Sequence, residues 1–214
     1  MQVFFDFDDV LFNTRTFVAA MCDVFEQQGV SRDVFYETYP QARVVGNAAV
    51  KVYSVGAHID ILHQLMPDVD AELLRSRYDA LFTDTSQYVF SDVREVLEDL
   101  KQQGAHIFVV SFGIEKVQRG KIEGSGLVPL LDGFFVGVEA KSQMIQPALD
   151  KDTSVWFIDD QPKFIDDVKT VFPFIKTIQM IRRDGRFTNE RHPKSDFVVE
   201  NMQEVNSLIV GHNV

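Results

Sequence analysis

The stretch "VFFDFDDVLFNT", residues 3–14, decides the fold because an apolar strand runs directly into a group of acidic residues. Its first three residues are apolar and β-favouring, which is typical of a buried strand. Asp6, Asp8 and Asp9 follow at once. Carboxylates that lie close together cannot all stay ionised at low cost, so the strand end needs a compensating partner. The alternative is that these aspartates only cap the loop and helix that follow.

The composition is that of a folded protein with one substantial core. The chain has 214 residues, of which 45% are hydrophobic and 25% are charged. Its formal net charge of −11 disfavours nucleic acids and anionic lipid surfaces, and the densest basic cluster, residues 182–186, is short. We therefore expect neither a nucleic-acid nor a membrane partner, and a monomer or homodimer.

The beginning of the chain and its cysteine content point to a compartment. The N-terminus starts with a strand where a signal segment would be basic and apolar, and no apolar run approaches the ~18 residues needed to cross a bilayer. The single cysteine, Cys22, cannot form an intramolecular disulfide, which suits a reducing environment. We expect a cytoplasmic protein.

Short apolar runs recur along the chain with helical segments between them. They are residues 2–7, 105–112, 133–138, 154–159 and 174–181, with 196–200 as a possible sixth. Nearly continuous apolar runs indicate strands that are covered on both faces, as in a parallel sheet. In the helical segment 91–104, Ser91 is a plausible N-cap and Gly104 a plausible end. The alternation predicts an α/β fold with a three-layer, Rossmann-like core.

One interval, residues 15–85, breaks this alternation because it shows helical patterns and no convincing buried strand. Three sets of apolar residues each share a helical face, and the third follows an N-cap candidate at Asp70. The sets are Phe17, Val18, Met21, Val24 and Phe25; Ile59, Leu62, Leu65 and Met66; and Leu73, Leu74, Tyr78, Leu81 and Phe82. We expect an inserted all-α domain over residues 15–85, and a core made of residues 1–14 and 86–214.

Polar residues follow three further apolar runs. The carboxyl ends of parallel strands lie on one edge of a sheet, where open α/β folds bind ligands. These residues are Ser111, Lys141, Asp159 and Asp160. The sequence therefore predicts that they converge on Asp6 and Asp8.

Taken in order, these motifs resemble those of the haloacid dehalogenase superfamily of phosphohydrolases. The matching segments are "FFDFDDVLFNT", "IFVVSFG", "EAKSQM" and "WFIDDQPKFIDD". The similarity spans nearly the whole chain, and residues 15–85 lie where members with a helical cap after the first strand carry that cap. The resemblance implies the catalytic core and helical cap of that superfamily.

The resemblance also implies a catalytic mechanism. Asp6 would be the nucleophile that forms a phosphoaspartyl intermediate, and Asp8 would be the general acid and base. A hard divalent cation, Mg²⁺, would neutralise the charge between phosphate and carboxylate. Its ligands would be the Asp6 carboxylate, the Asp8 backbone carbonyl and one acid of the pair Asp159 and Asp160. We favour Asp160 as the direct ligand, with Asp159 behind it.

The phosphoryl group would be bound by residues at two other strand ends. Ser111 and the backbone N–H groups of Phe112 and Gly113 would donate hydrogen bonds to its oxygens, although Ser111 could equally cap a helix. Lys141 would offset the negative charge of Asp6 and of the phosphate. Lys116 and Lys121 compete for that role.

Other polar residues receive weaker assignments. Asp9 is expected to serve the loop. Asp166 and Asp167 could include an acid that lies behind the metal ligands, but they are expected to lie on the solvated face of a helix. In the inserted domain Arg43, Lys51, Tyr53 and His58 are candidate substrate contacts, although such residues are more often only surface residues. The histidines show no metal-ligand spacing and are assigned nothing catalytic.

The leading hypothesis is a Mg²⁺-dependent phosphatase acting on a small phosphorylated metabolite, such as a sugar phosphate or a nucleotide monophosphate. A phosphomutase is the related alternative, and a non-catalytic phosphate-binding or metal-binding module is the alternative from another class. Dehalogenases share the nucleophile but lack the second acid, which is present here as Asp8. A receiver domain of a signalling pair does not fit this sequence, because its acceptor aspartate lies on a later strand and it has no helical insertion.

Overall fold

A six-stranded parallel sheet forms the centre of the molecule. The computed structural model describes residues 1–45, 51–183, 185 and 194–212. The strand order is β5-β4-β1-β6-β7-β8, and every neighbouring pair is parallel. The strands are β1 (Gln2–Phe5), β4 (His106–Phe112), β5 (Gly133–Gly137), β6 (Val155–Asp159), β7 (Lys176–Met180) and β8 (Phe197–Val199). All six expected strands are present, including the one that was only a possibility.

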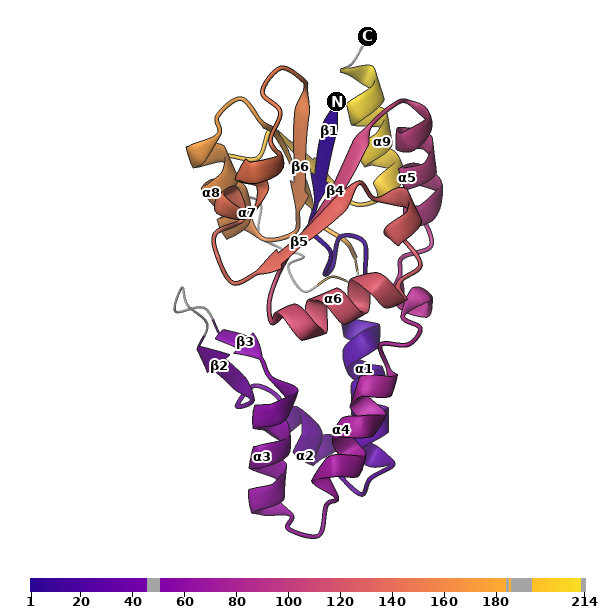
Figure 1. Cartoon of the computed structure of the whole chain (residues 1–214), viewed down its shortest axis with the longest axis vertical. Helices are drawn as coiled ribbons and strands as arrows, with labels where there is room; N and C mark the ends of the chain where they lie inside the picture. Colours follow the sequence, from indigo (N-terminus) through magenta and orange to yellow (C-terminus); the bar gives the residue numbers. More distant parts are fainter. Residues whose placement is uncertain (46–50, 184, 186–193, 213–214) are drawn as a thin grey trace.

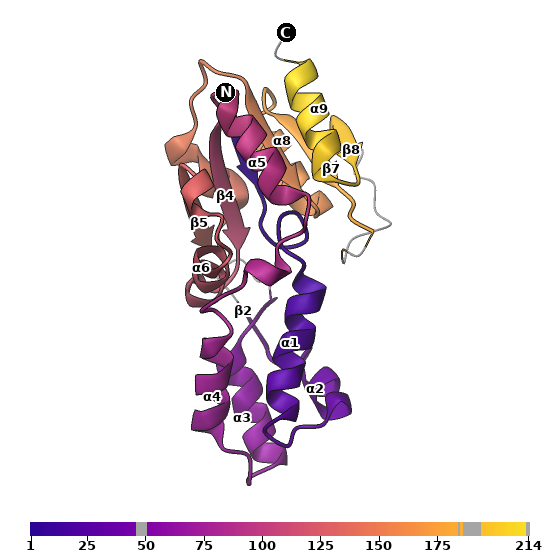
Figure 2. The same cartoon turned by 90° about the vertical axis from the view of Figure 1, so that its right-hand side faces the viewer.

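Helices cover both faces of the sheet, which confirms the three-layer core (Figures 1 and 2). Side chains alternate between the two faces along β1: Phe4 packs with one cluster, and Val3 and Phe5 pack with the other. The helices of the core are α5 (Val93–Gln102), α6 (Glu115–Gly124), α7 (Lys141–Ile145), α8 (Pro162–Val171) and α9 (Met202–Gly211), with 3₁₀ turns at Ser86–Tyr88, Val128–Leu130 and Gln146–Ala148. No helix in the described part of the chain is long and apolar enough to span a membrane.

The start of α5 differs from the expectation. Asp92, and not Ser91, is the N-cap residue, and its side chain makes no capping hydrogen bond. The Asp92 carboxylate instead accepts hydrogen bonds from Arg182 at 2.8 Å and from the Met202 backbone N–H at 2.9 Å. The prediction of Ser91 as the N-cap was wrong because Arg182 and Met202, which are distant in the sequence, bind Asp92 and fix the turn before α5. Gly104 adopts φ +77° just beyond the helix, as a helix-ending glycine does.

The inserted segment contains helices and a short β-ribbon. Its helices are α1 (Thr14–Glu26), α2 (Arg32–Thr38), α3 (Val55–Leu65) and α4 (Ala71–Ala80). The antiparallel strands β2 (Arg43–Val45) and β3 (Lys51–Tyr53) correct the expectation of an all-α insertion. Strands of three residues are too short to reveal a period of two in a sequence. Asp70 caps α4 as expected, whereas Leu65 is 63% exposed and does not join the buried face.

The inserted segment lies at the carboxyl edge of the central sheet, below the strands in Figure 1. The chain leaves and returns side by side, because the Asn13 N–H donates to the Tyr88 carbonyl at 2.7 Å. Thr85 fixes the returning chain to α6 through its N–H, which bonds the Gly124 carbonyl at 2.9 Å, and its hydroxyl, which bonds the Lys121 carbonyl at 2.7 Å. The boundaries at residues 14/15 and 85/86 stay a prediction.

A buried histidine joins the elements of the insertion. The Thr38 hydroxyl donates its proton to the Val34 carbonyl at 2.7 Å, so it accepts from Nε2–H of His58, also at 2.7 Å. The other ring nitrogen, Nδ1, lies 3.0 Å from the Tyr53 hydroxyl and accepts from it when the imidazole is neutral. These hydrogen bonds link α2, α3 and β3.

The neutral state of His58 predicts a pH-dependent stability. Burial lowers the pKa of His58 to about 4 from 6.5. Because the pKa in the folded protein lies below that of the unfolded chain, the stabilisation is complete above pH 6.5 and is lost as the pH falls towards 4. We expect a loss of up to about 3 kcal/mol in the free energy of unfolding over that window. Urea titrations at several pH values measure it.

The control is His58→Gln, whose amide can donate to Thr38 and accept from Tyr53 but does not titrate. Its unfolding free energy should fall less steeply than that of the wild type between pH 6.5 and 4. Parallel pH profiles for the two proteins would show that His58 is not the titrating group.

Candidate active site

Asp6 lies immediately after β1, at the middle of the carboxyl edge of the sheet. Its N–H donates to the Ile158 carbonyl at 2.8 Å, which continues the pairing with β6 for one residue. The carboxylate is buried, and its Oδ1 accepts from the Phe7 N–H at 2.7 Å. An acid at this position is therefore held by the sheet on one side and by the following loop on the other.

Lys141 lies between two buried carboxylates. Its side chain is 0% exposed, and its Nζ is 2.8 Å from Asp6 Oδ1 and 2.6 Å from Asp159 Oδ2. Burial raises the pKa of Asp6 to about 7, against the opposing effect of Lys141 and with a further increase from Asp159. Lys141 therefore offsets part of the cost of ionising these buried acids.

The other two candidate lysines lie elsewhere. Lys116 is exposed and pairs with Asp79 of α4 at 2.8 Å, whereas Lys121 is buried and pairs with Asp8. Among the three, Lys141 is the lysine beside Asp6, as expected. Its role in catalysis stays a prediction.

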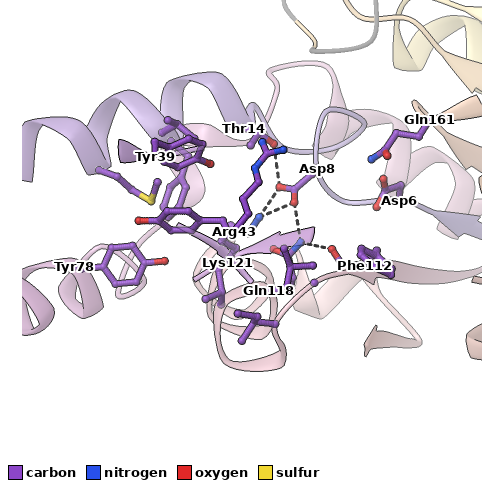
Figure 3. A pocket seen from close by; sticks show the side chains of 18 of the residues that line it. Asp6, Asp8, Thr14, Tyr39, Arg43, Tyr78, Phe112, Gln118, Lys121 and Gln161 are labelled. Atoms are coloured by element: carbon purple, nitrogen blue, oxygen red, sulfur yellow. Dashed lines mark hydrogen bonds and ion pairs between the residues drawn. The ribbon is translucent and has the colours of Figure 1, made fainter. Parts of the chain in front are cut away.

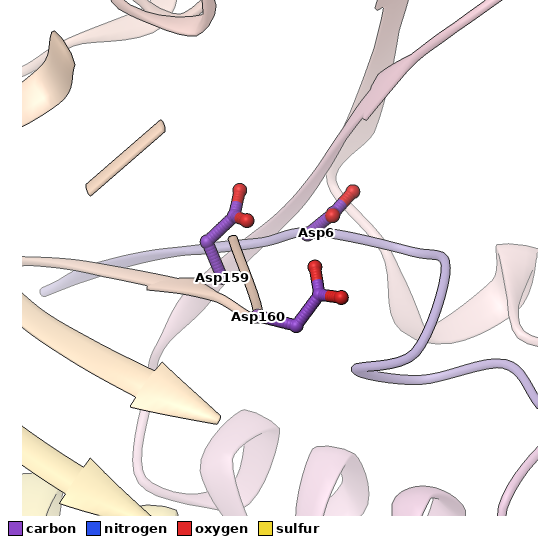
Figure 4. A group of neighbouring side chains, drawn as sticks. All are labelled: Asp6, Asp159 and Asp160. Atoms are coloured by element: carbon purple, nitrogen blue, oxygen red, sulfur yellow. The ribbon is translucent and has the colours of Figure 1, made fainter. Parts of the chain in front are cut away.

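Three carboxylates form a compact cluster at the ends of β1 and β6. One carboxylate oxygen from each of Asp6, Asp159 and Asp160 lies within 4.8 Å of the others, and all three residues are buried (Figure 4). Both oxygens of Asp159 accept hydrogen bonds, Oδ1 from the Gln161 N–H at 2.8 Å and Oδ2 from Lys141. Three buried carboxylates exceed the charge of one lysine, and their hard oxygens fit a divalent cation such as Mg²⁺.

Asp8 opens onto the adjacent pocket and is held by three side chains (Figure 3). Lys121 Nζ lies 2.5 Å from Oδ1 and 2.8 Å from Oδ2. Gln118 Nε2 donates to Oδ2 at 2.8 Å, and the Thr14 hydroxyl donates to Oδ1 at 3.0 Å. Asp8 is thus held in one position by Lys121, Gln118 and Thr14.

The sequence did not reveal Gln118 and Thr14 as partners of Asp8. The only available signal was the spacing of Gln118 and Lys121, which lie three residues apart and so share one face of α6. That spacing is common on solvated helices. The spacing indicates a shared partner only when the fold is known, because the fold places α6 beside Asp8.

Ser111 and Gly113 lie at the carboxyl end of β4, where the sequence predicts phosphate binding. Ser111 is 1% exposed, and its hydroxyl has no hydrogen-bond partner within the described residues. A buried orphan hydroxyl at this edge is what a phosphate-binding serine would present before its ligand arrives. The Gly113 N–H donates to the Gly137 carbonyl at 2.8 Å in this structure, and its binding of the phosphate stays a prediction.

Gly113 and Phe112 have another function in this conformation. A Cβ atom on Gly113 would lie 2.8 Å from Cγ of Gln118, so only glycine fits beside that side chain. Gln118 also donates to the Phe112 carbonyl at 3.0 Å. The turn after β4 therefore positions Gln118, and through it Asp8.

Asp167 has a role that the sequence analysis assigned to solvent. Its carboxylate accepts from the Ser142 N–H at 2.9 Å and from the Ser142 hydroxyl at 2.8 Å, which ties α8 to the first turn of α7, next to Lys141. The expectation of a solvated face was wrong for Asp167, because sequence does not show which helices pack together. Asp166 pairs with Lys194 at the surface, as a solvated residue would.

Asp9 serves the loop, as expected. It adopts φ +60°, in the left-handed region that glycine favours. Its N–H donates to the Phe12 carbonyl at 2.7 Å and closes the turn that follows Asp8.

A pocket of about 430 Å³ lies between the core and the inserted domain. The core side carries the charged residues Asp6, Asp8 and Lys121 together with apolar side chains such as Ile114 and Val117. The pocket is further lined by Thr14, at the start of α1, and by the inserted domain, which supplies Phe17, Val18, Met21, Tyr39, Arg43, Val52, Tyr53 and Tyr78. The volume is ordinary for a small-molecule site.

The expected substrate contacts of the inserted domain separate into distinct groups. Arg43 and Tyr53 line the pocket, whereas His58 is buried and contacts Tyr53. The side chain of Lys51 lies outside the described residues. Lys163 also lines the pocket, from α8, and was not among the residues expected there. Its only signal in the sequence is its position shortly after Asp159 and Asp160.

Comparisons with known proteins identify the family. A family model described as haloacid dehalogenase-like hydrolase matches residues 3–163. No protein with a curated description matches the sequence.

Solved structures with low sequence identity share the fold over the whole chain. A chain described as a haloacid dehalogenase-like hydrolase from Burkholderia xenovorans LB400 is 17% identical, with a TM-score of 0.76, and the match covers 100% of this chain and 98% of that one. A phosphatase of the same superfamily from Thermococcus onnurineus is 19% identical over 100% and 99% of the two chains, with a TM-score of 0.61.

L-2-haloacid dehalogenase from Xanthobacter autotrophicus, with chloropropionic acid covalently bound, has the same fold. It is 14% identical over 98% of each chain, with a TM-score of 0.65. Enzymes of different chemistry therefore share this architecture, and the reaction must be argued from the site.

Proposed function

Because this chain belongs to the haloacid dehalogenase-like hydrolase family, we propose that it hydrolyses a small phosphomonoester through Asp6. The observation that carries the proposal is the second carboxylate. Asp8 opens onto the same pocket as Asp6 and is oriented by Lys121, Gln118 and Thr14. A hydrolase that displaces halide needs no proton donor for its leaving group, whereas an alkoxide leaving group does.

The first step transfers the phosphoryl group to Asp6. An oxygen of the Asp6 carboxylate attacks phosphorus, and the bond from phosphorus to the ester oxygen breaks. Asp8 gives a proton to that oxygen, which leaves as the alcohol. Lys141 and the Ser111 hydroxyl, which lie beside Asp6 and at the neighbouring strand end, balance the charge on the phosphoryl oxygens.

The second step frees the enzyme. Asp8, now a carboxylate, takes a proton from a water molecule whose oxygen attacks phosphorus. The bond from phosphorus to Asp6 breaks, inorganic phosphate leaves, and the Asp6 carboxylate is restored. The same residue thus acts first as an acid and then as a base, and no other reactant is required.

The donor set favours a divalent cation at the acidic cluster. The residues that would hold it are the Asp6 carboxylate, the Asp8 backbone carbonyl and Asp160, with Asp159 engaged by Lys141 and Gln161 behind them. The ion supplies charge neutralisation between the phosphate and the carboxylates. Mg²⁺ is the natural choice for oxygen ligands.

Addition of Mg²⁺ is therefore expected to stabilise the protein. At a concentration one hundred times the dissociation constant, a site of this kind adds about 2.7 kcal/mol to the free energy of unfolding. Differential scanning fluorimetry with and without Mg²⁺ measures the shift of the melting temperature. Asp160→Asn should lose most of the shift, whereas Asp166→Asn, at a surface acid outside the cluster, should keep it. Equal shifts in both variants would contradict the site.

The proposal is tested by the product that appears. Purified protein is incubated with p-nitrophenyl phosphate and, separately, with 2-chloropropionate, and phosphate and chloride are measured with Mg²⁺ and with a chelator. We expect phosphate release that requires Mg²⁺, and no chloride. Chloride release without phosphate release would overturn the proposal. When a sugar phosphate is added as a second compound, transfer of the phosphoryl group to it without net release of phosphate would identify a phosphomutase.

A further inference from the structure

The inserted domain contributes an aromatic and apolar wall to the pocket. Tyr39 and Tyr53 stack with their ring centroids 4.6 Å apart and their planes at 24°. Phe17, Met21 and Val52 continue the wall, and all five residues line the same cavity. Such a surface binds flat apolar groups and offers little to a polyhydroxylated one.

The wall is held in place from behind. The Tyr53 hydroxyl donates to Nδ1 of His58, and His58 in turn donates to Thr38. The hydroxyl of Tyr53 is therefore engaged inside the inserted domain, and its ring is what faces the ligand. Because the Tyr53 ring is already fixed, it loses little conformational entropy when it binds an aromatic group.

Tyr78 adds a polar group that the protein itself does not satisfy. Its side chain is 1% exposed, and its hydroxyl has no hydrogen-bond partner among the residues that the structure describes. Figure 3 shows this hydroxyl directed into the pocket from α4. Burial raises the pKa of Tyr78, so the hydroxyl keeps its proton and can act as a donor. A buried donor without a partner is rare and points to a ligand.

Arg43, a positively charged side chain of the inserted domain, lies toward the other end of the pocket. Arg43 is the charged side chain that this domain contributes to the lining within the described residues. Figure 3 shows it directed toward Asp8, at the carboxylate end, and away from Tyr78. The charged side chains and the Tyr78 hydroxyl therefore lie at different ends of the pocket. We expect the anionic group of a ligand at the charged end and an aromatic group at the end near Tyr78.

We propose that the preferred substrate is an aryl phosphomonoester whose ring carries a hydrogen-bond acceptor. The ring packs against Tyr39 and Tyr53, and the Tyr78 hydroxyl donates to the acceptor. Sugar phosphates are disfavoured because their hydroxyl groups would face the apolar wall unpaired. The inference rests on the proposed function for the position of the phosphate, but its aromatic specificity is tested by binding alone.

The test uses phosphonates, which cannot be hydrolysed. Phenylphosphonate, 4-nitrophenylphosphonate and 2,3-dihydroxypropylphosphonate are titrated into the full chain with Mg²⁺ by calorimetry. We expect the phenyl compound to bind about tenfold more tightly than the dihydroxypropyl compound, and the nitro substituent to add a further gain of about fivefold. Equal or tighter binding of the dihydroxypropyl compound would overturn the inference.

Two variants assign the effect to residues. Tyr78→Phe should lose the gain from the nitro group, keep its affinity for phenylphosphonate and melt no lower than the wild type, because the lost hydroxyl had no partner. An unchanged preference for the nitro compound would refute the role of Tyr78. Tyr53→Leu should reduce binding of both aryl compounds, whereas Tyr53→Phe, which keeps the ring, should retain most of it. Tyr53→Leu with undiminished aryl binding would refute the wall.

Binding also separates the two claims. A wild-type protein that releases no phosphate from any ester but prefers phenylphosphonate would refute the proposed function and leave the aromatic specificity standing. A protein that hydrolyses phosphomonoesters but binds the dihydroxypropyl compound more tightly would do the reverse.

Discussion

Replacing Asp6 with Asn is expected to reduce phosphate release by about 10⁴-fold or more, because the amide oxygen is a poor nucleophile toward phosphorus. Release of p-nitrophenol from p-nitrophenyl phosphate under saturating Mg²⁺ measures the effect. The size of the loss separates a nucleophile from a residue that only binds the substrate, whose removal would mainly raise KM.

The Asp6→Asn variant should remain folded. Lys141 keeps its partner Asp159 at 2.6 Å, and the substitution removes one of several buried negative charges. We therefore expect a melting temperature close to that of the wild type in the absence of Mg²⁺. A folded Asp6→Asn protein with more than a tenth of the wild-type rate would show that Asp6 is not the nucleophile.

Replacing Lys141 with Met is expected to destabilise the protein by about 3–5 kcal/mol, since removal of one partner leaves buried carboxylates uncompensated. The acids concerned are Asp6 and Asp159, which Lys141 bridges at 2.8 and 2.6 Å. Urea unfolding measures the change. Activity should fall with it, because the same lysine balances the charge that the phosphate brings.

The matched control is Lys116→Met. Lys116 also pairs with an aspartate at 2.8 Å, but its side chain is 73% exposed, so the substitution should cost no more than about 1 kcal/mol. Lys141→Met should also depend more strongly on Mg²⁺ for its stability than the wild type, because the ion replaces part of the missing charge. Similar unfolding curves for the two lysine variants would contradict the central position of Lys141.

Much of the core was predictable from local sequence. The strands are short, nearly continuous apolar runs, and the parallel sheet then brings their carboxyl ends to one edge. This logic is sufficient to bring Lys141 and Asp159 to Asp6, because Asp159 ends β6 and Lys141 comes shortly after β5. The order of the motifs along the chain therefore predicts which side chains lie beside Asp6.

The partners of Asp8 could not be predicted in the same way. Gln118 and Lys121 reach Asp8 from a helix that lies over the pocket, over a sequence separation of more than one hundred residues. Asp167 likewise supports the start of α7 only because two helices pack together. Such contacts depend on tertiary packing, for which no local pattern exists. The same is true of Tyr78, which the sequence indicated only as one apolar member of a helical face.

The most direct test of the central claim is to identify the residue that becomes phosphorylated. The Asp8→Asn variant is mixed with p-nitrophenyl phosphate, whose leaving group needs no proton, and quenched within the first turnovers. Without the base, the phosphoaspartate should persist. Borohydride reduction followed by peptide mass spectrometry should then find homoserine in place of Asp6. Burst release of p-nitrophenol with no modification of Asp6, or with modification of another carboxylate, would contradict the account.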